Sequence, residues 1–491
     1  MKKRRYKDGS LDGVYTPAAK GIETLETLIP DSMDEGMKSA LERLDKALGG
    51  DVAGFVCARL KVSREELARY FKAEQVDSIA LAIYNIEARH EAMVCGDETG
   101  VGKGRQAAGI VRYAKENGRL PIFFTEKKNL FSDFYRDAKD TGIAHYRPLI
   151  INSDGTVYDY DKCIDSTPGE EKYEAVYEPL PNSEMTKIFK SRRMPEGYDY
   201  ILCTYSQLSD SEEKKEFLAA VAQRGKAVYV CDEAHNAAGQ SSRGDVVREL
   251  ISAEGCDVIF LSATFAKAPK NLLLYIQRTK LKDCTTPLTL SLAIARGGIP
   301  LQELISSLLV ESGQMVRRQR DNTKIEVNYN NTDEADRQID DVNYNRIMRF
   351  VRDALSLQNM HVRELISQLK QQKVLPKSAK PYSIFSYMFV ITNALLLAIK
   401  AKSVVKKTIE HVRDGRAVVI GLSQTSAAHL EPQRLINLMG KNVKVGDLVR
   451  GDFAQYLLFI LERSLVISQG KDEEENEDGS HKDQKTILDL D

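Results

Sequence analysis

A glycine-rich segment followed by a lysine is the first group of residues whose types and spacing could do chemistry. Residues 96–106 have the sequence Gly-Asp-Glu-Thr-Gly-Val-Gly-Lys-Gly-Arg-Gln, directly after a short apolar run and directly before a helical pattern. A strand, a glycine-rich turn and a helix in this order are the setting of a phosphate-binding loop. Gly100 and Gly102 let the backbone curl so that its N–H groups point at phosphate oxygens, and Lys103 can reach the β- and γ-phosphates.

This segment departs from the usual phosphate-loop pattern at two positions. Gly104 stands where a serine or threonine hydroxyl ordinarily binds magnesium, and Asp97 stands where the first glycine ordinarily lies. Taken alone, the segment also fits a glycine-rich helix start that binds no ligand. If it is a phosphate loop, the residues that hold the nucleotide are Thr99, Gly100, Val101, Gly102, Lys103, Gly104 and Arg105.

A pair of adjacent acids forms the second candidate group. The apolar run 227–231 ends in Asp232-Glu233-Ala234-His235. An aspartate at the carboxyl end of a strand beside a phosphate loop can hold Mg²⁺ through water, and the next glutamate can orient and deprotonate an attacking water. We therefore predict catalytic roles for Lys103, Asp232, Glu233 and His235.

A third short motif, Ser262-Ala263-Thr264, follows the apolar run 258–261. Taken alone, it also fits a strand end with a capping hydroxyl. In this order along the chain, we expect Ser262 and Thr264 to couple a nucleotide site to a nucleic-acid site, with His235 at the switch between the two motifs.

The elements that must position these residues are predicted from short apolar runs that alternate with helical patterns. Runs of four to six apolar residues separated by helices indicate buried parallel strands, and hence an α/β sheet. The predicted strands are 92–95, 121–125, 200–204, 227–231 and 258–262.

Together these motifs resemble a superfamily 2 helicase or translocase with an Asp-Glu-x-His box. The form of the glycine-rich segment is similar to the Swi/Snf branch, and the continuation Gly-Val-Gly-Lys-Gly-Arg-Gln resembles the Strawberry notch-type helicases, in which glycine follows the lysine. The resemblance covers about residues 70–431. It implies a RecA-like parallel sheet, ATP and Mg²⁺ as nucleotide and metal, and nucleic acid as partner, DNA rather than RNA.

Further segments match that family and imply residue roles. Gln75 resembles the upstream glutamine that contacts adenine. Segment 124–130, with Arg136-Asp137 following, resembles motif Ia, and segment 203–208 resembles motif Ib. The two resemblances imply nucleic-acid contacts from Thr125, Lys127, Thr204 and Tyr205. The basic group Arg317, Arg318 and Arg320 could contact nucleic acid or pair with the acidic stretch 333–341, and the sequence favours neither.

The domain organisation that the resemblance implies is incomplete. A motor of this kind needs a second RecA-like domain that ends in a Gln-x-x-Gly-Arg-x-x-Arg motif, whose arginine completes the ATP site. No such motif follows the strand-like run 417–422. We expect the amino-terminal part of a larger protein, a half that needs a partner chain, or a degenerate motor. The predicted regions are 1–70, helical; 71–284, the first RecA-like domain with an insertion at about 153–198; 285–412, helical; 413–470, the start of a second RecA-like domain; and 471–491, an acidic disordered tail.

Composition limits the remaining possibilities. The 491 residues carry 70 Lys and Arg against 71 Asp and Glu, which excludes a histone-like, wholly basic nucleic-acid binder. The seven cysteines lie far apart without a Cys-x-x-Cys pair, so neither a zinc site nor a disulfide framework is indicated. No apolar stretch is long enough to suggest a membrane partner. We predict a cytoplasmic protein, bacterial or in the host cell if phage- or plasmid-borne, and nuclear if eukaryotic.

Two function classes follow from these observations. The first is an ATP-dependent helicase or translocase core that hydrolyses ATP with Mg²⁺. The second is a hydrolysis-deficient nucleotide-binding regulatory module that needs a partner chain, since the last motif is absent. A nucleoside kinase or small GTPase is disfavoured, because the chain carries Asp-Glu-Ala-His and lacks an Asn-Lys-x-Asp guanine motif.

Overall fold

The chain divides into two compact units, Met1–Glu326 and Val327–Asp491, in a computed structural model of the protein. The structure describes residues 4–5, 11–166, 172–208, 211–237, 242–264, 271–283, 286–322, 325, 334–372, 374, 380–381, 385–421, 466–468 and 485–487.

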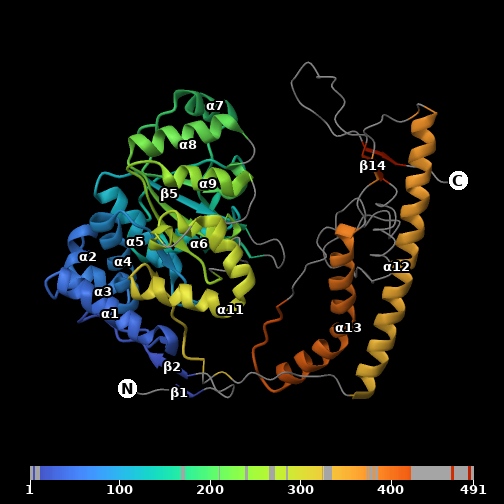
Figure 1. The fold of residues 1–491 in the computed structure, drawn as a ribbon, viewed down its shortest axis with the longest axis horizontal. Helices are drawn as coiled ribbons and strands as arrows, with labels where there is room; N and C mark the ends of the chain where they lie inside the picture. The colour runs from blue at the N-terminus through green and yellow to red at the C-terminus, as the bar shows by residue number, and fades with distance from the viewer. Residues whose placement is uncertain are drawn as a thin grey trace. The chain divides into compact units, whose positions relative to one another are not determined.

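A parallel sheet of seven strands forms the centre of the first unit (Figure 1). Every neighbouring pair in it is parallel, as the buried apolar runs predicted, and the sheet has the RecA-like α/β form. In spatial order the strands are β12 (Met315–Val316), β4 (Met93–Cys95), β11 (Asp257–Leu261), β10 (Val228–Asp232), β5 (Pro121–Thr125), β9 (Tyr200–Thr204) and β6 (Pro148–Ile150).

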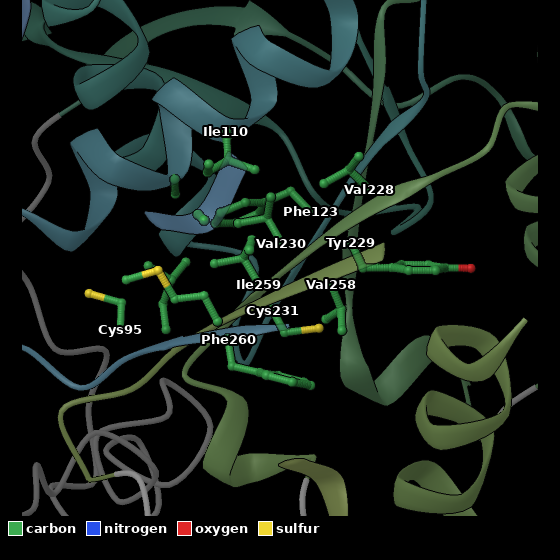
Figure 2. Packing of buried hydrophobic residues seen from close by; sticks show 14 of the residues in the cluster. Cys95, Ile110, Phe123, Val228, Tyr229, Val230, Cys231, Val258, Ile259 and Phe260 are labelled. Atoms are coloured by element: carbon green, nitrogen blue, oxygen red, sulfur yellow. The ribbon is translucent and has the colours of Figure 1, made fainter. Parts of the chain in front are cut away.

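Both faces of this sheet are covered, which is why its strands are apolar without alternation. Phe123 and Ile259 lie beside Val230 in register. Figure 2 shows these three side chains on one side of the strands, and Cys231 and Phe260 on the other. All five are at most 3% exposed, so each strand buries its side chains in two layers of the core.

Helices follow the strands along the chain and cover the sheet. Ile110 of α5 packs on the side of Phe123 (Figure 2). Tyr275 of α10 packs edge-on against Phe260 on the opposite side, with the ring centroids 4.9 Å apart. The α-helices after β4 in this unit are α5 (Lys103–Glu116), α6 (Leu130–Asp140), α7 (Asn182–Ser191), α8 (Glu212–Arg224), α9 (Ser242–Ser252), α10 (Leu272–Ile276) and α11 (Pro287–Glu311).

The amino-terminal region is only partly as predicted. Its helices are α1 (Asp31–Ala47), α2 (Val52–Leu60), α3 (Arg64–Tyr70) and α4 (Ala73–Tyr84), and α4 continues into a π-helical turn, Asn85–Arg89. The sequence did not predict the small antiparallel sheet of β1 (Arg4–Arg5), β2 (Leu11–Val14) and β3 (Leu28–Pro30). Strands of two to four residues leave too short a pattern to detect.

The predicted insertion contains regular structure. Strands β7 (Val157–Asp165) and β8 (Lys172–Tyr177) pair antiparallel as a separate two-stranded sheet, and α7 follows. Most of the second half of β7 is exposed, which agrees with a surface position.

The second unit contains two long helices, α12 (Glu334–Gln371) and α13 (Phe385–Arg413), as the helical pattern predicted. Strands β13 (Lys380–Pro381), β14 (Val466–Ser468) and β15 (Lys485–Ile487) form an antiparallel sheet.

One predicted strand of this unit is wrong over the part that the structure describes. Residues 416–421 are not in a strand, and Val419 is 96% exposed. A β-branched run becomes a strand only where a neighbouring strand pairs with it. Most of 413–470 and of the predicted tail lies outside the described residues, so a second RecA-like domain stays a prediction. Among the described residues, none of the helices is apolar over a length that would cross a bilayer.

Candidate functional site

The three predicted motifs converge on one edge of the sheet. The glycine-rich segment follows β4, Ser262 follows β11, and Asp232 ends β10. These strands are consecutive in the sheet, and all run in the same direction. In open α/β sheets ligands bind at the carboxyl ends of the strands, which is where these side chains gather.

The glycine-rich segment turns sharply from β4 into α5. Gly100 and Gly102 have φ values of +93° and +91°, which side-chain-bearing residues rarely adopt. A Cβ atom at Gly102 would also lie 2.2 Å from Nε2 of Gln75, so only glycine fits there. Lys103 begins α5, and its Nζ donates to the carbonyl of Asp97 at 2.8 Å. The lysine is thus folded over the loop, where a phosphate could accept from it.

Gln75 braces this loop from α4. Its Nε2 donates to the carbonyl of Val101 at 2.9 Å, and its Oε1 accepts from the backbone N–H of Lys72 at 3.0 Å. The side chain is 3% exposed. Both ends of the amide are therefore engaged by the protein itself, and in this arrangement Gln75 positions the loop. The predicted adenine contact stays a prediction, and it would require the amide to release one of these partners.

Asp97, the first departure from the phosphate-loop pattern, holds a buried ion pair. Its carboxylate accepts from Nη2 of Arg318 at 2.6 Å and from Nε at 3.0 Å, and both side chains are 0% exposed. Burial opposes ionisation, but the charge of Arg318 and its hydrogen bonds hold the pKa of Asp97 below its usual value. An acid replaces the first glycine here because it fastens the loop to the segment that follows α11. Arg318 therefore pairs with Asp97, a partner that neither of the two open alternatives named.

Asp232 lies at the end of β10 with its carboxylate held in place. Thr125 Oγ1 donates to its Oδ2 at 3.1 Å, and Tyr205 Oη donates to its carbonyl at 2.8 Å. Burial raises the pKa of Asp232 to about 6, and the charge of Glu233 adds to the rise, whereas Thr125 and the charge of Lys103 oppose it. Lys103 and Asp232 are thus within electrostatic reach of each other across the sheet edge.

Glu233 and His235 continue from Asp232 in a strained turn. Glu233 has φ +46°, a left-handed conformation that is uncommon for this residue type and recurs at functional sites. Nδ1 of His235 lies 2.9 Å from Oγ of Ser262 and 3.3 Å from Oε2 of Glu233. Ser262 is buried, and its N–H donates to the carbonyl of Cys95. His235 therefore connects the acidic motif to the strand beside the phosphate loop.

The remaining predicted nucleotide residues differ in exposure. Thr99 and Gly100 are exposed at the outside of the loop, whereas Val101 is buried. Arg105 is directed elsewhere: it donates to the carbonyl of Tyr70 at 3.2 Å and pairs with Asp140 of α6. Thr264 is exposed and has no contact with His235 among the interactions of the described residues.

Three of the four side chains predicted to contact nucleic acid lie inside the protein. Thr125, Thr204 and Tyr205 are at most 3% exposed. Thr125 and Tyr205 are bonded to Asp232, while Thr204 Oγ1 accepts from Asn152 at 2.8 Å. Their hydroxyls support the acidic motif and the strand ends instead of facing a phosphate backbone. Lys127 is exposed and stays a prediction.

The donor set fits magnesium bound together with a nucleotide. Mg²⁺ is usually held by one or two carboxylates, while phosphates and waters supply the other ligands. Asp232 meets this requirement, with Glu233 beside it. Elsewhere in the described part of the chain, no group of three metal-ligating side chains occurs that would suggest an all-protein metal centre.

Two features of the site were missed from the sequence. Arg318 was seen only as a member of a basic cluster, and Asp137 of α6 only as part of a motif Ia resemblance. Asp137 lies against Gly104, the second departure from the phosphate-loop pattern. Asp97 and Gly104, the two departures from the phosphate-loop pattern, thus each have a partner far away in the sequence. An unusual residue within a known pattern is therefore a signal that a distant residue compensates for it.

Comparisons with known proteins give distant structural likenesses and one family match. No curated protein matches the sequence. Among solved structures, the Sulfolobus solfataricus SWI2/SNF2 ATPase core in complex with dsDNA is 14% identical, with a TM-score of 0.34, over 61% of this chain and 57% of that one. The SWI2/SNF2 ATPase core domain of the same organism is 16% identical, with a TM-score of 0.35, over 52% of this chain and 44% of that one. These likenesses are too weak to carry an argument about activity.

The family of the chain is established by its own sequence. A family model described as P-loop containing NTP hydrolase pore-1 matches residues 60–346, which is more than half of the chain and includes every motif of the sheet edge. The chain therefore belongs to this family of P-loop NTP hydrolases.

Proposed function

We propose that the chain is the ATP-hydrolysing core of a nucleic-acid helicase or translocase, of the Strawberry notch type and acting on DNA. The observation that carries the proposal is the convergence of Lys103, Asp232 and Glu233 on one sheet edge, with His235 joining them to Ser262. A nucleotide hydrolase without mechanical output needs the first three groups, but it does not need the connection to Ser262.

The roles follow from the positions of the groups. Lys103 and the N–H groups of the loop bind the triphosphate, and Asp232 would hold Mg²⁺, which when bound would neutralise phosphate charge. Glu233 accepts a proton from the attacking water. The water oxygen bonds to the γ-phosphorus as the bond between the γ-phosphorus and the oxygen that bridges to the β-phosphate breaks. The products are ADP and phosphate.

His235 and Ser262 are suited to report this reaction. Nδ1 of His235 lies near both the Glu233 carboxylate and the Ser262 hydroxyl, so a shift of Glu233 on hydrolysis changes the balance between two hydrogen-bond partners. Ser262 begins the segment after β11, which can carry the change away from the nucleotide.

Nucleic-acid contacts are proposed for Lys127, which lies two residues after the end of β5. The experiment is ATP hydrolysis by the full 491-residue chain with and without single- and double-stranded DNA and RNA. We expect DNA to stimulate turnover and Glu233→Gln to abolish it while nucleotide binding persists. Lys127→Ala should reduce the salt dependence of DNA binding by roughly one phosphate contact, whereas Lys190→Ala, an exposed lysine on α7, should not. Equal turnover by wild type and Glu233→Gln would refute the assignment.

The second candidate is a nucleotide-binding module that does not turn over. The arginine of a Gln-x-x-Gly-Arg-x-x-Arg motif contributes about 10³–10⁵ to the rate in related systems, and in this candidate a partner chain must supply it. Tight ATP binding without phosphate release, with DNA or RNA added, would support this second candidate over the first.

A further inference from the structure

Position 104 lacks the usual hydroxyl, and a carboxylate of the neighbouring helix α6 lies beside it. In phosphate loops the residue after the lysine supplies a hydroxyl to Mg²⁺, and here that residue is Gly104. The space beside it is filled. A Cβ atom built on Gly104 would lie only 1.9 Å from Oδ2 of Asp137 and 2.8 Å from its Cγ.

This closeness places the Asp137 oxygen where the missing side chain would begin. A single bond to carbon is ~1.5 Å long, so Oδ2 lies little more than one bond length from the position of the absent Cβ. A serine or threonine at position 104 would require the Asp137 carboxylate to move from this position. In this structure the carboxylate of Asp137 occupies space that Gly104 leaves open.

Among the residues that the structure describes, no hydrogen bond or ion pair engages the Asp137 carboxylate, although Asp133 and Asp140 of the same helix pair with Arg136 and Arg105. It is partly buried, and burial raises the pKa of Asp137 against the opposing charges of Arg136 and Arg105. A carboxylate in this position gains from a nearby cation.

We propose that Asp137 takes the part of the missing hydroxyl and holds the magnesium of the bound nucleotide, directly or through one water. A carboxylate is a suitable replacement, because Mg²⁺ prefers hard oxygen ligands and commonly takes one or two carboxylates beside the phosphates. The inference rests on the proposed function, since it needs a Mg-nucleotide in the loop that begins α5. Asp232 would supply the other carboxylate, from β10.

The test measures how strongly Mg²⁺ favours nucleotide binding. A fluorescent ATP analogue is titrated into the full chain in excess Mg²⁺ and again in EDTA, and the ratio of the two dissociation constants gives the magnesium effect. We expect Asp137→Asn and Asp137→Ala to reduce this ratio by roughly 10–100-fold, as loss of groups that support a metal does, while binding in EDTA is unchanged. Asp133→Asn, on the same helix, should leave the ratio as in wild type.

A residue exchange separates this role from simple packing. Gly104→Ser alone should impair the magnesium effect, because its Cβ meets the carboxylate, whereas Gly104→Ser combined with Asp137→Ala should restore it to within roughly threefold of wild type. A purely structural role for Asp137 would change binding in EDTA as much as in Mg²⁺.

The possible failures are distinguishable. If wild type binds the analogue and the ratio is the same in Asp137→Asn, the inference is overturned and the proposed function stands. The inference is likewise overturned if the double variant is no better than Asp137→Ala. If wild type does not bind the analogue at all, the proposed function fails, and the inference fails with it.

Discussion

Arg318→Met tests the ion pair that fastens the phosphate loop to the segment after α11. The substitution removes a buried cation and leaves the Asp97 carboxylate without it, in a position that is 0% exposed. Removing one partner of a buried pair is expected to destabilise a protein by about 3–5 kcal/mol. Arg318 also donates to the carbonyl of Glu74 and to Ser78, so we place the loss toward the upper end of this range.

The stability lost in Arg318→Met should depend on pH, and the direction follows from the pKa of Asp97. In wild type the pKa of Asp97 is lowered, so its stabilising contribution is present above the unfolded pKa and is lost as pH falls through the folded pKa. In Arg318→Met, Asp97 stays buried but loses the cation, so its folded pKa rises above its unfolded pKa. The destabilisation by this substitution therefore grows as pH rises. Unfolding of the full chain in urea, followed by circular dichroism, should show a larger loss at about pH 7.5 than at about pH 5.

Two variants complete the test. Asp97→Asn combined with Arg318→Met leaves no charge at either position of the pair. It should recover part of the stability lost at neutral pH, because an unpaired buried carboxylate costs more than a neutral amide. Arg317→Met, a neighbouring exposed arginine, should change stability little. If Arg318→Met unfolds at the same urea concentration as wild type, or loses equal stability at both pH values, the interpretation of this pair is wrong.

The other predictions concern the loop, the relay and a second buried acid. Gln75→Ala should weaken nucleotide binding roughly tenfold, since the buried carbonyl of Val101 loses its donor; unchanged affinity in a fluorescence titration would contradict the bracing role. Ser262→Ala should lower kcat for ATP hydrolysis and leave KM unchanged, because only the contact with His235 is removed; a change confined to KM would argue against a relay. Burial raises the folded pKa of Asp77, in α4, to about 6. The contribution of Asp77 to stability therefore falls by roughly 3 kcal/mol as pH rises from about 4 to 6. Asp77→Asn should flatten this part of a curve of stability against pH, and an unaltered slope would refute the prediction.

The sequence predicted best the features that depend on residues close together in the chain, namely the buried strands and the motifs at their ends. Strands such as β5 and β10 could be predicted because both faces of the sheet are covered and the runs are continuously apolar. The order of the motifs then placed Lys103, Asp232 and Ser262 at one edge, since parallel strands share the edge at which they end. No distance was needed for that inference, only topology.

The sequence was least informative where residues far apart in the chain decide the outcome. Asp97 with Arg318, and Gly104 with Asp137, are contacts that no local pattern contains. Thr125, Thr204 and Tyr205 follow or end strands as predicted, but motif position cannot tell whether a hydroxyl faces solvent or a neighbouring strand end. Position 419 lies in a run that would suit a strand, yet no strand of the described residues pairs with it and it is exposed.

Equilibrium binding of Mg-ATP to the full chain tests the central claim most directly. Calorimetric titration compares wild type with Lys103→Ala, and with Lys190→Ala as a control for the loss of one positive charge far from the loop. Loss of a hydrogen bond from a charged group, at about 1.5–3 kcal/mol, predicts that Lys103→Ala binds roughly 10–100-fold more weakly while Lys190→Ala binds as wild type does. Equal affinity in all three proteins would contradict a nucleotide site at this edge of the sheet.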